Sequence, residues 1–309
     1  MSPAGSEEEE TVVDAPVVFV SVIIPVHDDF QQLKKCLQAL EDQTYPKGSY
    51  EVVVVDNGSS ESIEPVVAGF GQALAVREGR IGSYAARNKG LSLARGEVIA
   101  FTDSDCIPEP DWIEGGVARL RGTVGCGLVA GKVEIFFEDP LRPTAVELYE
   151  SATAFPQRRY VELRKYGATA NLFTFKSVFE DVGPFDEGLR SGGDYEWGRR
   201  VHSSGYGQVY ADDVRVWHPA RRSFGQLRGK IVRVAGGHRS SPEPADSSRF
   251  KLELLVRLLP PVRGALRVLS NKRLGGIGDR LKVVLVMCLV RYLQVWERLR
   301  VRLRGKPEG

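Results

Sequence analysis

The sequence has few cysteines, and they are far apart. Cys36, Cys106, Cys126 and Cys288 form no CxxC pair, so neither a zinc site nor a disulfide framework is predicted. A reducing, cytosolic setting fits this cysteine usage best. The formal net charge of the 309 residues is only +2. Such a balance gives no reason to expect a nucleic acid partner.

A targeting segment and the common phosphate-binding loops are also missing. The first residues, MSPAGSEEEE, have no basic segment followed by an apolar run, which argues against a secretory signal. We expect residues 1–16 to form a disordered acidic tail. There is no GxxxxGK[ST] and no GxGxxG after the first apolar run. These absences argue against P-loop phosphoryl transfer and against a dinucleotide-dependent dehydrogenase.

What the sequence does contain is a regular alternation of two patterns. Apolar, β-branched runs predict strands, and segments with apolar residues three or four positions apart predict helices. The predicted strands cover residues 17–26, 51–55, 73–77 and 97–102, and the predicted helices cover residues 31–43, 63–70 and 83–94. This is the pattern of βαβ units with right-handed crossovers. It predicts an α/β fold around a parallel sheet.

Polar residues follow three of these strands, in the clusters Pro25 to Asp28, Asp56 to Ser59 and Asp103 to Asp105. In a parallel sheet these ends lie on one edge, where ligands bind in open α/β folds. The Asp-Ser-Asp triplet follows the apolar run VIAFT directly. Carboxylates placed there suit a nucleotide and an oxygen-liganded Mg²⁺ or Mn²⁺.

Five segments in this order, SVIIPVHDD, VVVVDNGSS, AARNKG, FTDSDCIPEPDWI and GGDYEW, closely resemble the family 2 glycosyltransferases. The resemblance covers roughly Val17 to Pro219. It implies the GT-A fold, a Rossmann-like, mostly parallel central sheet with helices on both faces, followed here by a C-terminal helical extension. We therefore divide the chain into a tail (1–16), a GT-A domain (17–239) and a basic amphipathic extension (240–309).

On the donor side, the resemblance implies a nucleotide site formed by Pro25, Val26, His27, Asp56, Arg87, Asp103 and Ser104. Asp56 matches the aspartate that binds the base, and His27 stands where many relatives have a tyrosine. Two structural alternatives stay open from the residues themselves. Asp56 can simply form a turn before Gly58, and Arg87 can be an ordinary arginine on a helix surface.

For the metal and the acceptor, the resemblance implies Asp105 and His218 as ligands of Mn²⁺ or Mg²⁺ and Asp194 as the general base. Gly193 replaces the family's usual glutamate before that base. Glu196, Trp197 and Asn171 are expected on the acceptor side. The structural alternatives are a polar turn for the triplet, a dipole-favoured aspartate in a first helical turn for Asp194, and a structural histidine for His218.

The predicted reaction is therefore an inverting, metal-dependent sugar transfer of the kind used in polysaccharide biosynthesis. The donor is a nucleoside diphosphate sugar, with UDP expected and dTDP or GDP as alternatives, and the acceptor is a saccharide or a lipid-linked saccharide. A sugar-nucleotide nucleotidyltransferase shares the α/β layout, but its glycine-rich first loop is absent from PVHDD. A non-catalytic module that only binds sugar nucleotides is the second alternative, and the three retained aspartates argue against it.

The end of the chain differs in charge from the rest. Between Lys251 and Gly309 there are fourteen basic and four acidic residues, interleaved with LELLVRLLPPV and LKVVLVMCLVRYLQVWERLRVRL. The second run is interrupted by Arg291 and is too short and too charged for a membrane span. It suits an interfacial helix on anionic lipid or a helix pair packed on the catalytic domain. Of the two we favour peripheral attachment, on the inner face of the cell membrane.

Overall fold

The computed structural model describes residues 17–237, 258–271 and 274–303. The predicted acidic tail and the predicted boundary between residues 239 and 240 lie outside these ranges.

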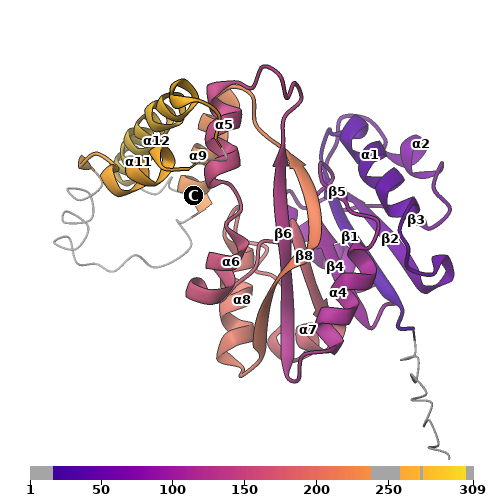
Figure 1. The fold of residues 1–309 in the computed structure, drawn as a ribbon. Coiled ribbons are helices and arrows are strands. Elements are labelled where there is room, and N and C mark those ends of the chain that lie inside the picture. Colours follow the sequence, from indigo (N-terminus) through magenta and orange to yellow (C-terminus); the bar gives the residue numbers. More distant parts are fainter. Residues whose placement is uncertain (1–16, 238–257, 272–273, 304–309) are drawn as a thin grey trace, which may run out of the picture.

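A mixed, eight-stranded sheet forms the centre of the described chain (Figure 1). Its strands are β1 Val20–Val26, β2 Tyr50–Asp56, β3 Ala73–Arg77, β4 Val98–Thr102, β5 Ile107–Pro108, β6 Cys126–Phe136, β7 Asn171–Phe175 and β8 Gly207–Pro219. They lie in the order β3-β2-β1-β4-β7-β6-β8-β5. Four of the seven pairings are parallel, and those of β4 with β7, β6 with β7 and β5 with β8 are antiparallel. The predicted α/β class is confirmed.

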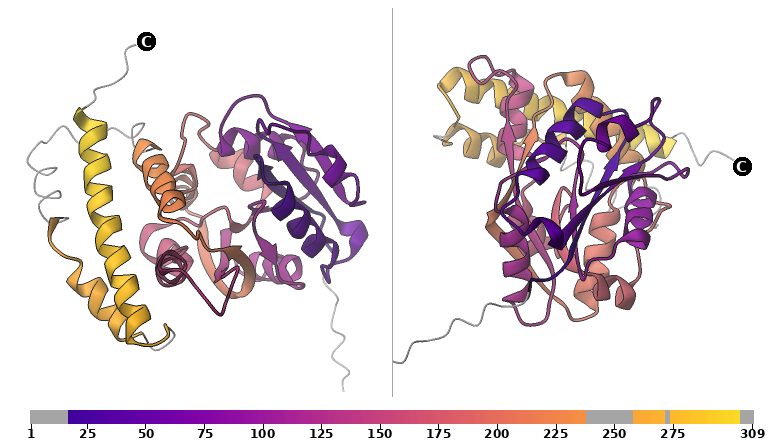
Figure 2. Two further views of the ribbon diagram at one scale, coloured as in Figure 1. Left: turned by 90° about the horizontal axis from the view of Figure 1, so that it is seen from above. Right: turned by 90° about the vertical axis from the view of Figure 1, so that its right-hand side faces the viewer.

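Helices cover both faces of this sheet, as the views in Figure 2 show. One apolar core joins the sheet to α1 Phe30–Glu41, α2 Glu64–Val67 and α4 Trp112–Arg121. A second core, on the other face, contains side chains of α3 Ser83–Leu93, α7 Lys176–Val182 and α8 Gly193–Ser203. Short turns complete this part: η1 Lys47–Ser49, α6 Gln157–Arg159 and the π-helical η2 Tyr160–Arg164.

The register of the first strands places their polar ends side by side. β1 pairs with β2 in step, from Val20 with Tyr50 to Val26 with Asp56, and β4 runs parallel on the other side of β1. Six of the seven residues of β1 and all seven of β2 are buried, as expected for central parallel strands covered on both faces. The clusters after β1, β2 and β4 therefore meet at one edge of the sheet.

A separate group of helices lies at one side of the sheet (Figures 1 and 2). It consists of α5 Ala145–Thr153, α9 Phe224–Gly237, α11 Val262–Leu269 and α12 Ile277–Leu303. Val286 and Val290 of α12 pack with Leu227 and Ile231 of α9 and with Val146 of α5. One face of the C-terminal extension thus packs on the preceding domain. None of the described helices is long and apolar enough to cross a membrane.

We expect Gly116→Ala to destabilise the fold. A Cβ atom at Gly116, in α4, would lie 2.3 Å from the ring of Phe173, which is fully buried in β7. Alanine gains about 1 kcal/mol of helix propensity over glycine, but overpacking a rigid core costs about 1–3 kcal/mol. The clash should therefore prevail and lower Tm in a thermal unfolding experiment.

Gly229→Ala is the matched control, because it lies within α9 and no heavy atom lies within 4 Å of its added Cβ. Its Tm should stay equal or rise slightly. Equal Tm values for the two variants would contradict the proposed contact between α4 and β7.

Candidate active site

The loops that follow β1 and β2 are bonded into one unit. The Asn57 amide donates to the Val26 carbonyl oxygen over 2.9 Å, and the Asp28 amide donates to Ser59 Oγ over 3.0 Å. Asp28 Oδ1 in turn accepts from the Ser60 amide over 2.6 Å. Asp28 has a φ of 54°, a left-handed conformation that these bonds hold in place. The convergence predicted for the strand ends is confirmed here.

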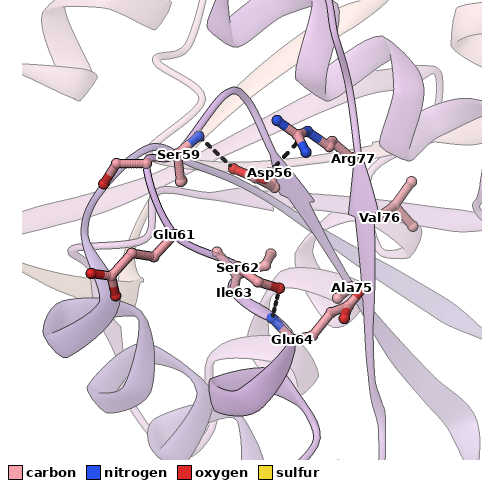
Figure 3. A pocket seen from close by; sticks show the side chains of 10 residues that line it. Asp56, Ser59, Glu61, Ser62, Ile63, Glu64, Ala75, Val76 and Arg77 are labelled. Atoms are coloured by element: carbon pink, nitrogen blue, oxygen red, sulfur yellow. Dashed lines mark hydrogen bonds and ion pairs between the residues drawn. The ribbon is translucent and has the colours of Figure 1, made fainter.

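Asp56 closes the turn after β2 and also faces a pocket. Its Oδ1 accepts from the Ser59 amide over 2.9 Å, and its Oδ2 lies 4.0 Å from Nε of Arg77. The pocket is lined by Asp56, Ser59, Ser60, Glu61, Ser62, Ile63, Glu64, Ala75, Val76 and Arg77 (Figure 3). The turn-forming role of Asp56 is thus real, and it leaves the second carboxylate oxygen directed toward Arg77.

The three residues predicted to contact the donor at the end of β1 differ in exposure. The Val26 side chain is 2% exposed and belongs to the core, so only its backbone can reach a ligand. Pro25 is half-buried. The His27 side chain is 64% exposed, and its Nδ1 lies 3.1 Å from the Asn57 carbonyl oxygen. Most of the His27 side chain is therefore exposed at the end of β1.

Arg87 and Asp103 form the ion pair at the centre of the site. Arg87 Nη2 donates to Asp103 Oδ1 over 2.5 Å, and the Arg87 side chain is only 5% exposed. The alternative of an arginine on the helix surface is therefore wrong. Arg87 Nε is buried without a hydrogen-bond partner among the described residues. This atom is a buried donor available to a ligand.

The Asp-Ser-Asp triplet forms a β-turn, which the Cys106 amide closes by donating to the Asp103 carbonyl oxygen over 3.0 Å. Ser104 lies inside the turn and is 9% exposed. The side chains of Asp103 and Asp105 keep 31% and 29% of their surface exposed. Both carboxylates are thus partly open to a ligand, and the polar turn and the binding role do not exclude one another.

Asp105 faces His218, which ends β8. Asp105 Oδ2 lies 3.4 Å from His218 Nε2, while His218 Nδ1 donates to the Pro219 carbonyl oxygen over 2.7 Å. Burial raises the pKa of Asp105, and the adjacent His218 opposes that rise. In the neutral imidazole, the lone pair of Nε2 would face a carboxylate oxygen. A proton or a cation between the two atoms removes this repulsion.

Asp194 lies in the first turn of α8, as the sequence predicts. The Tyr84 hydroxyl donates to its Oδ1 over 3.3 Å, and the Tyr195 amide donates to the same oxygen over 2.9 Å. Burial raises the pKa of Asp194, and Arg87 opposes the shift. The charge of Asp194 also helps to raise the pKa values of Tyr160 and Tyr166 nearby, after burial as the main cause. The carboxyl group thus sits among phenol rings with its basicity increased.

The tyrosine at position 84 also explains the glycine at position 193. A Cβ atom on Gly193 would lie 2.8 Å from the Tyr84 ring, so the ring fills the space that a side chain at this position would need. The guanidinium carbon of Arg87 lies 5.7 Å from the centre of the same ring. Tyr84 therefore connects the two halves of the site, a role that sequence reasoning missed. In the sequence, Tyr84 lies three residues before Arg87, and this spacing places both side chains on one face of a helix. That spacing could have indicated that Tyr84 belongs to the site.

Two residues predicted on the acceptor side are instead part of the core. Trp197 has 0% exposure, stacks on Phe179 with ring centres 4.4 Å apart, and cannot form a wall for a sugar ring. Asn171 also has 0% exposure. Its amide donates to the carbonyl oxygens of Lys132 and Val214 and accepts from the Trp112 indole. Both predictions are wrong, because each side chain is fully occupied inside the protein.

Glu196 is partly exposed but engaged within its own helix. Its Oε1 accepts from Arg200 Nε over 2.7 Å and its Oε2 accepts from Arg200 Nη2 over 3.0 Å. This two-point ion pair stabilises α8 rather than reaching toward Asp194.

A second charged cluster, which the sequence did not reveal, joins the site to the helical group. Glu150 of α5 accepts from the backbone and side chain of Arg221 and from Lys230 of α9. Burial opposes ionisation of Glu150, but these two cations hold its pKa below the ordinary value. The Lys230 ammonium lies 5.6 Å from the Phe155 ring centre, and Phe155 lies 4.8 Å from the His218 ring.

A sheet of this order, with carboxylates at the ends of its first strands and an aspartate at the start of a following helix, is that of a GT-A glycosyltransferase. Residues 21–183 match the family model described as Glycosyl transferase family 2. Because the match covers more than half of the chain, this protein belongs to glycosyltransferase family 2 and is a glycosyltransferase enzyme.

Relatives and solved structures agree with this placement. The chain is 44% identical to Glycosyltransferase AglE of Haloferax volcanii over 224 residues, which are 71% of this chain and 72% of that protein. It is 29% identical to Pre-mycofactocin glycosyltransferase of Mycobacterium tuberculosis over 223 residues, 70% of this chain but only 45% of that protein.

Two solved structures share the fold. Mannosyltransferase PcManGT from Pyrobaculum calidifontis, in complex with GDP-Man and Mn²⁺, has a TM-score of 0.62 at 18% identity, over 94% of this chain and 89% of that one. S. aureus TarS in complex with UDP-GlcNAc has a TM-score of 0.52 at 17% identity, over 89% of this chain and 72% of that one. At these identities the likeness is one of fold.

Proposed function

We propose that this enzyme transfers a sugar, with inversion, from a nucleoside diphosphate sugar to a hydroxyl group of a saccharide or lipid-linked saccharide. The observation that carries the proposal is a continuous series of contacts across the site. Asp103 bonds to Arg87, Arg87 lies over the Tyr84 ring, and the Tyr84 hydroxyl donates to Asp194. These contacts support the proposal, in which Asp103 would bind the donor and Asp194 would act as the base of the same site.

The donor nucleotide would lie across the ends of β1, β2 and β4. Asp56 would accept from the base, and Asp103 would accept from the ribose. Arg87 Nε, buried and without a described partner, would donate to the diphosphate. UDP is the expected nucleotide, with dTDP and GDP as alternatives. The solved neighbours support a nucleotide sugar but carry different bases, GDP-Man in one and UDP-GlcNAc in the other.

Asp105 and His218 would hold a divalent cation, Mn²⁺ or Mg²⁺. A carboxylate oxygen and an imidazole nitrogen that face one another at 3.4 Å fit such an ion, as both can be ligands of Mn²⁺. Within the described ranges no group of three or more His, Cys, Asp and Glu side chains could hold a metal, so the donor diphosphate and water would supply the other ligands. When bound, the ion neutralises charge on the departing diphosphate.

Asp194 would act as the general base. The acceptor oxygen attacks the anomeric carbon and gives its proton to the Asp194 carboxylate, while the bond from that carbon to the diphosphate oxygen breaks and the diphosphate keeps the electron pair. One displacement from the face opposite the leaving group inverts the anomeric centre. The raised pKa of Asp194 makes it a stronger base than an ordinary aspartate.

A thermal-shift screen of UDP, GDP, dTDP and CDP, each with and without Mn²⁺, tests the donor and the metal together. The expected result is one nucleotide that raises Tm only when the ion is present. The corresponding sugar nucleotide should then be turned over with saccharide or lipid-linked acceptors. Binding without any hydrolysis or transfer would contradict the proposal and favour a non-catalytic binding module.

For the location of the enzyme, the proposal is peripheral attachment on the inner face of the cell membrane. The basic excess at the end of the chain, fourteen residues against four, supports it through attraction to anionic lipid. A lipid-linked acceptor would be presented at the same surface.

At pH values below the pKa of Asp194, Tyr84→Phe should lower kcat by roughly tenfold, because loss of a charge-assisted hydrogen bond of about 1.5 kcal/mol lowers the ionised fraction of the base by that factor. The hydroxyl donates to the ionised form of Asp194, so its loss should raise the pKa of that carboxyl further. The acidic limb of the pH profile of kcat should therefore move to higher pH. Steady-state kinetics over a pH series measure both effects.

Tyr195→Phe is the control, since the Tyr195 side chain is exposed and lies next to Asp194 in the sequence. It should leave kcat and the acidic limb unchanged. A Tyr84→Phe enzyme with reduced kcat but an unmoved pH profile would show that the ring supports the fold and that the hydroxyl has no effect on the base.

A further inference from the structure

The outward face of α12 is apolar. From Leu281 to Trp296 only one exposed side chain is charged, that of Lys282. The exposed apolar residues repeat every three or four positions and so lie along one side of the helix. We call them the outer stripe: Ile277, Leu281, Leu285, Leu289, Tyr292 and Trp296, each 43–64% exposed. A helix on the surface of a soluble domain normally has polar residues there.

Packing among the described residues does not account for the outer stripe. The opposite face of α12, with Val283, Val286 and Val290 at 0–5% exposure, already fills the apolar contacts to α5, α9 and α11. The helix thus has two apolar faces, one covered and one open. An exposed apolar patch of this kind marks an interaction surface.

The neighbouring helix also carries exposed apolar residues. Val262 and Leu266 of α11 are 57% and 62% exposed, and α11 packs along α12 through Val268. Arg263 and Arg267 are exposed beside them. Figures 1 and 2 show the two helices side by side at the edge of the molecule that is far from β3. Exposed basic and exposed apolar residues therefore occur together on α11, next to α12.

Charge and composition identify the partner. The excess of basic residues in this part of the chain attracts an anionic surface, whereas a second copy would bring two strongly basic segments together. Tyr292 and Trp296 at one end of the stripe are residue types that gather where an apolar phase meets water. The stripe is about 28 Å long, at 1.5 Å per residue, and no described helix is apolar enough to span a membrane.

We propose that α11 and α12 lie flat on an anionic lipid bilayer, with the outer stripe inserted among the acyl chains and the arginines at the level of the lipid phosphates. This deepens the membrane location proposed above and rests on it for the source of the acceptor. The docked helices would be joined firmly to the catalytic edge. α12 packs on α5, and Glu150 of α5 bonds to Arg221, three residues beyond His218.

Vesicle flotation with the full chain tests this inference. Binding is measured on vesicles of phosphatidylcholine with phosphatidylglycerol and on vesicles of phosphatidylcholine alone, at low and high salt. The test variant carries Leu285→Gln and Leu289→Gln, and the control carries Leu74→Gln and Leu141→Gln, which are 53% and 92% exposed on the sheet domain. All four leucines already face solvent, so Tm should change little, and a thermal scan of each variant checks this.

The expected result is binding to anionic vesicles that weakens with salt. It should fall roughly tenfold to a hundredfold in the stripe variant, as expected when two leucines leave an apolar phase, and stay unchanged in the control. Equal binding of stripe variant and control, or equal binding to neutral vesicles, would overturn the inference. So would a dimer in sedimentation that the stripe variant dissociates. The nucleotide thermal shift, measured on the same samples, shows separately whether the proposed donor site is intact.

Discussion

Asp194→Asn should reduce kcat for sugar transfer by roughly 10²- to 10⁴-fold, the range that general base catalysis contributes. Asparagine has the same shape, and its carbonyl oxygen can still accept from the Tyr84 hydroxyl and the Tyr195 amide. What it cannot do is take the proton of the acceptor hydroxyl. Donor binding, measured as the nucleotide-dependent rise in Tm, should therefore stay close to that of the wild type.

The same substitution should not destabilise the protein at neutral pH. Burial raises the pKa of Asp194 above 3.8, its ordinary value. The folded state therefore binds the proton more tightly than the unfolded state, so stability from this group falls as pH rises above 3.8. Removing the charge should leave Tm at pH 7 equal or higher. Loss of activity with equal or greater stability separates a catalytic role from a structural one.

In the wild type, the dependence of kcat on pH should follow the ionisation of Asp194. Activity should be lost as pH falls through its raised pKa, at a higher pH than for an exposed aspartate. The groups that act on this carboxyl are, besides the Tyr195 amide, Arg87, Tyr84 and Asp103, with Tyr160 and Tyr166 close by. The residual kcat of the Asp194→Asn variant should no longer fall as the pH is lowered through this range.

Glu196→Gln is the control within the same helical turn. Its carboxylate is paired with Arg200, so kcat should stay within about twofold of the wild type, given that exposed ion pairs contribute about 1 kcal/mol or less. If Glu196→Gln were as inactive as Asp194→Asn, the base would have to be assigned again.

The strand ends were predictable from sequence because local patterns and one topological rule fix them. Short β-branched runs such as YEVVVVD favour buried strands, and strands that run parallel have their carboxyl ends on one edge of the sheet. Asp56, Asp103 and Asp105 therefore fall together without knowledge of any distant contact. The π-helical turn at Tyr160–Arg164 and the antiparallel β7 had no comparable local signal.

The errors on the acceptor side have a physical reason. A tryptophan in an amphipathic helix can face a ligand or the core. Which of the two occurs depends on the residues that pack against the helix, and these are distant in the sequence. Trp197 shares a helical face with Val201 and meets Phe179 across α7 and α8, a contact that no local pattern reveals. Tyr84 was missed for a related reason, because it meets Gly193 and Asp194 from a helix more than a hundred residues earlier.

At the C-terminal end, the sequence left two possibilities open, packing on the catalytic domain and attachment to a membrane. The structure shows α12 packed through one face, and the exposed face is the one proposed to bind lipid. Val286 and Val290 of α12 face inward against α5 and α9. The exposed side chains are those of Leu281, Leu285, Leu289, Tyr292 and Trp296. A run such as VVLVMCLV has no polar face, so its periodicity cannot tell which side packs. The arginines that argued against a buried helix are compatible with packing on one face only.

Asp105→Asn should abolish the metal-dependent part of donor binding and lower kcat/KM by roughly 10²- to 10³-fold, as expected when charge stabilisation of a leaving group is lost. The substitution keeps the shape of the side chain but removes the negative charge that faces His218 Nε2 at 3.4 Å. The rise in Tm with nucleotide should then be the same with and without Mn²⁺. Treating the wild type with a chelator should give the same nucleotide response.

Asp29→Asn distinguishes a lost ligand from a lost charge. Asp29 acts on the pKa of Asp105 through its charge, yet it begins α1 and lies outside the triplet. If Asp105 acts as a ligand, Asp29→Asn should retain the effect of Mn²⁺ and Asp105→Asn should lose it. If Asp105→Asn still showed the Mn²⁺-dependent rise in Tm with nucleotide, Asp105 would not be a metal ligand. The proposed metal site between Asp105 and His218 would then be wrong. Loss in both variants would assign the effect to the negative potential of the site instead, because two carboxylates close together attract a cation even where only one of them touches it.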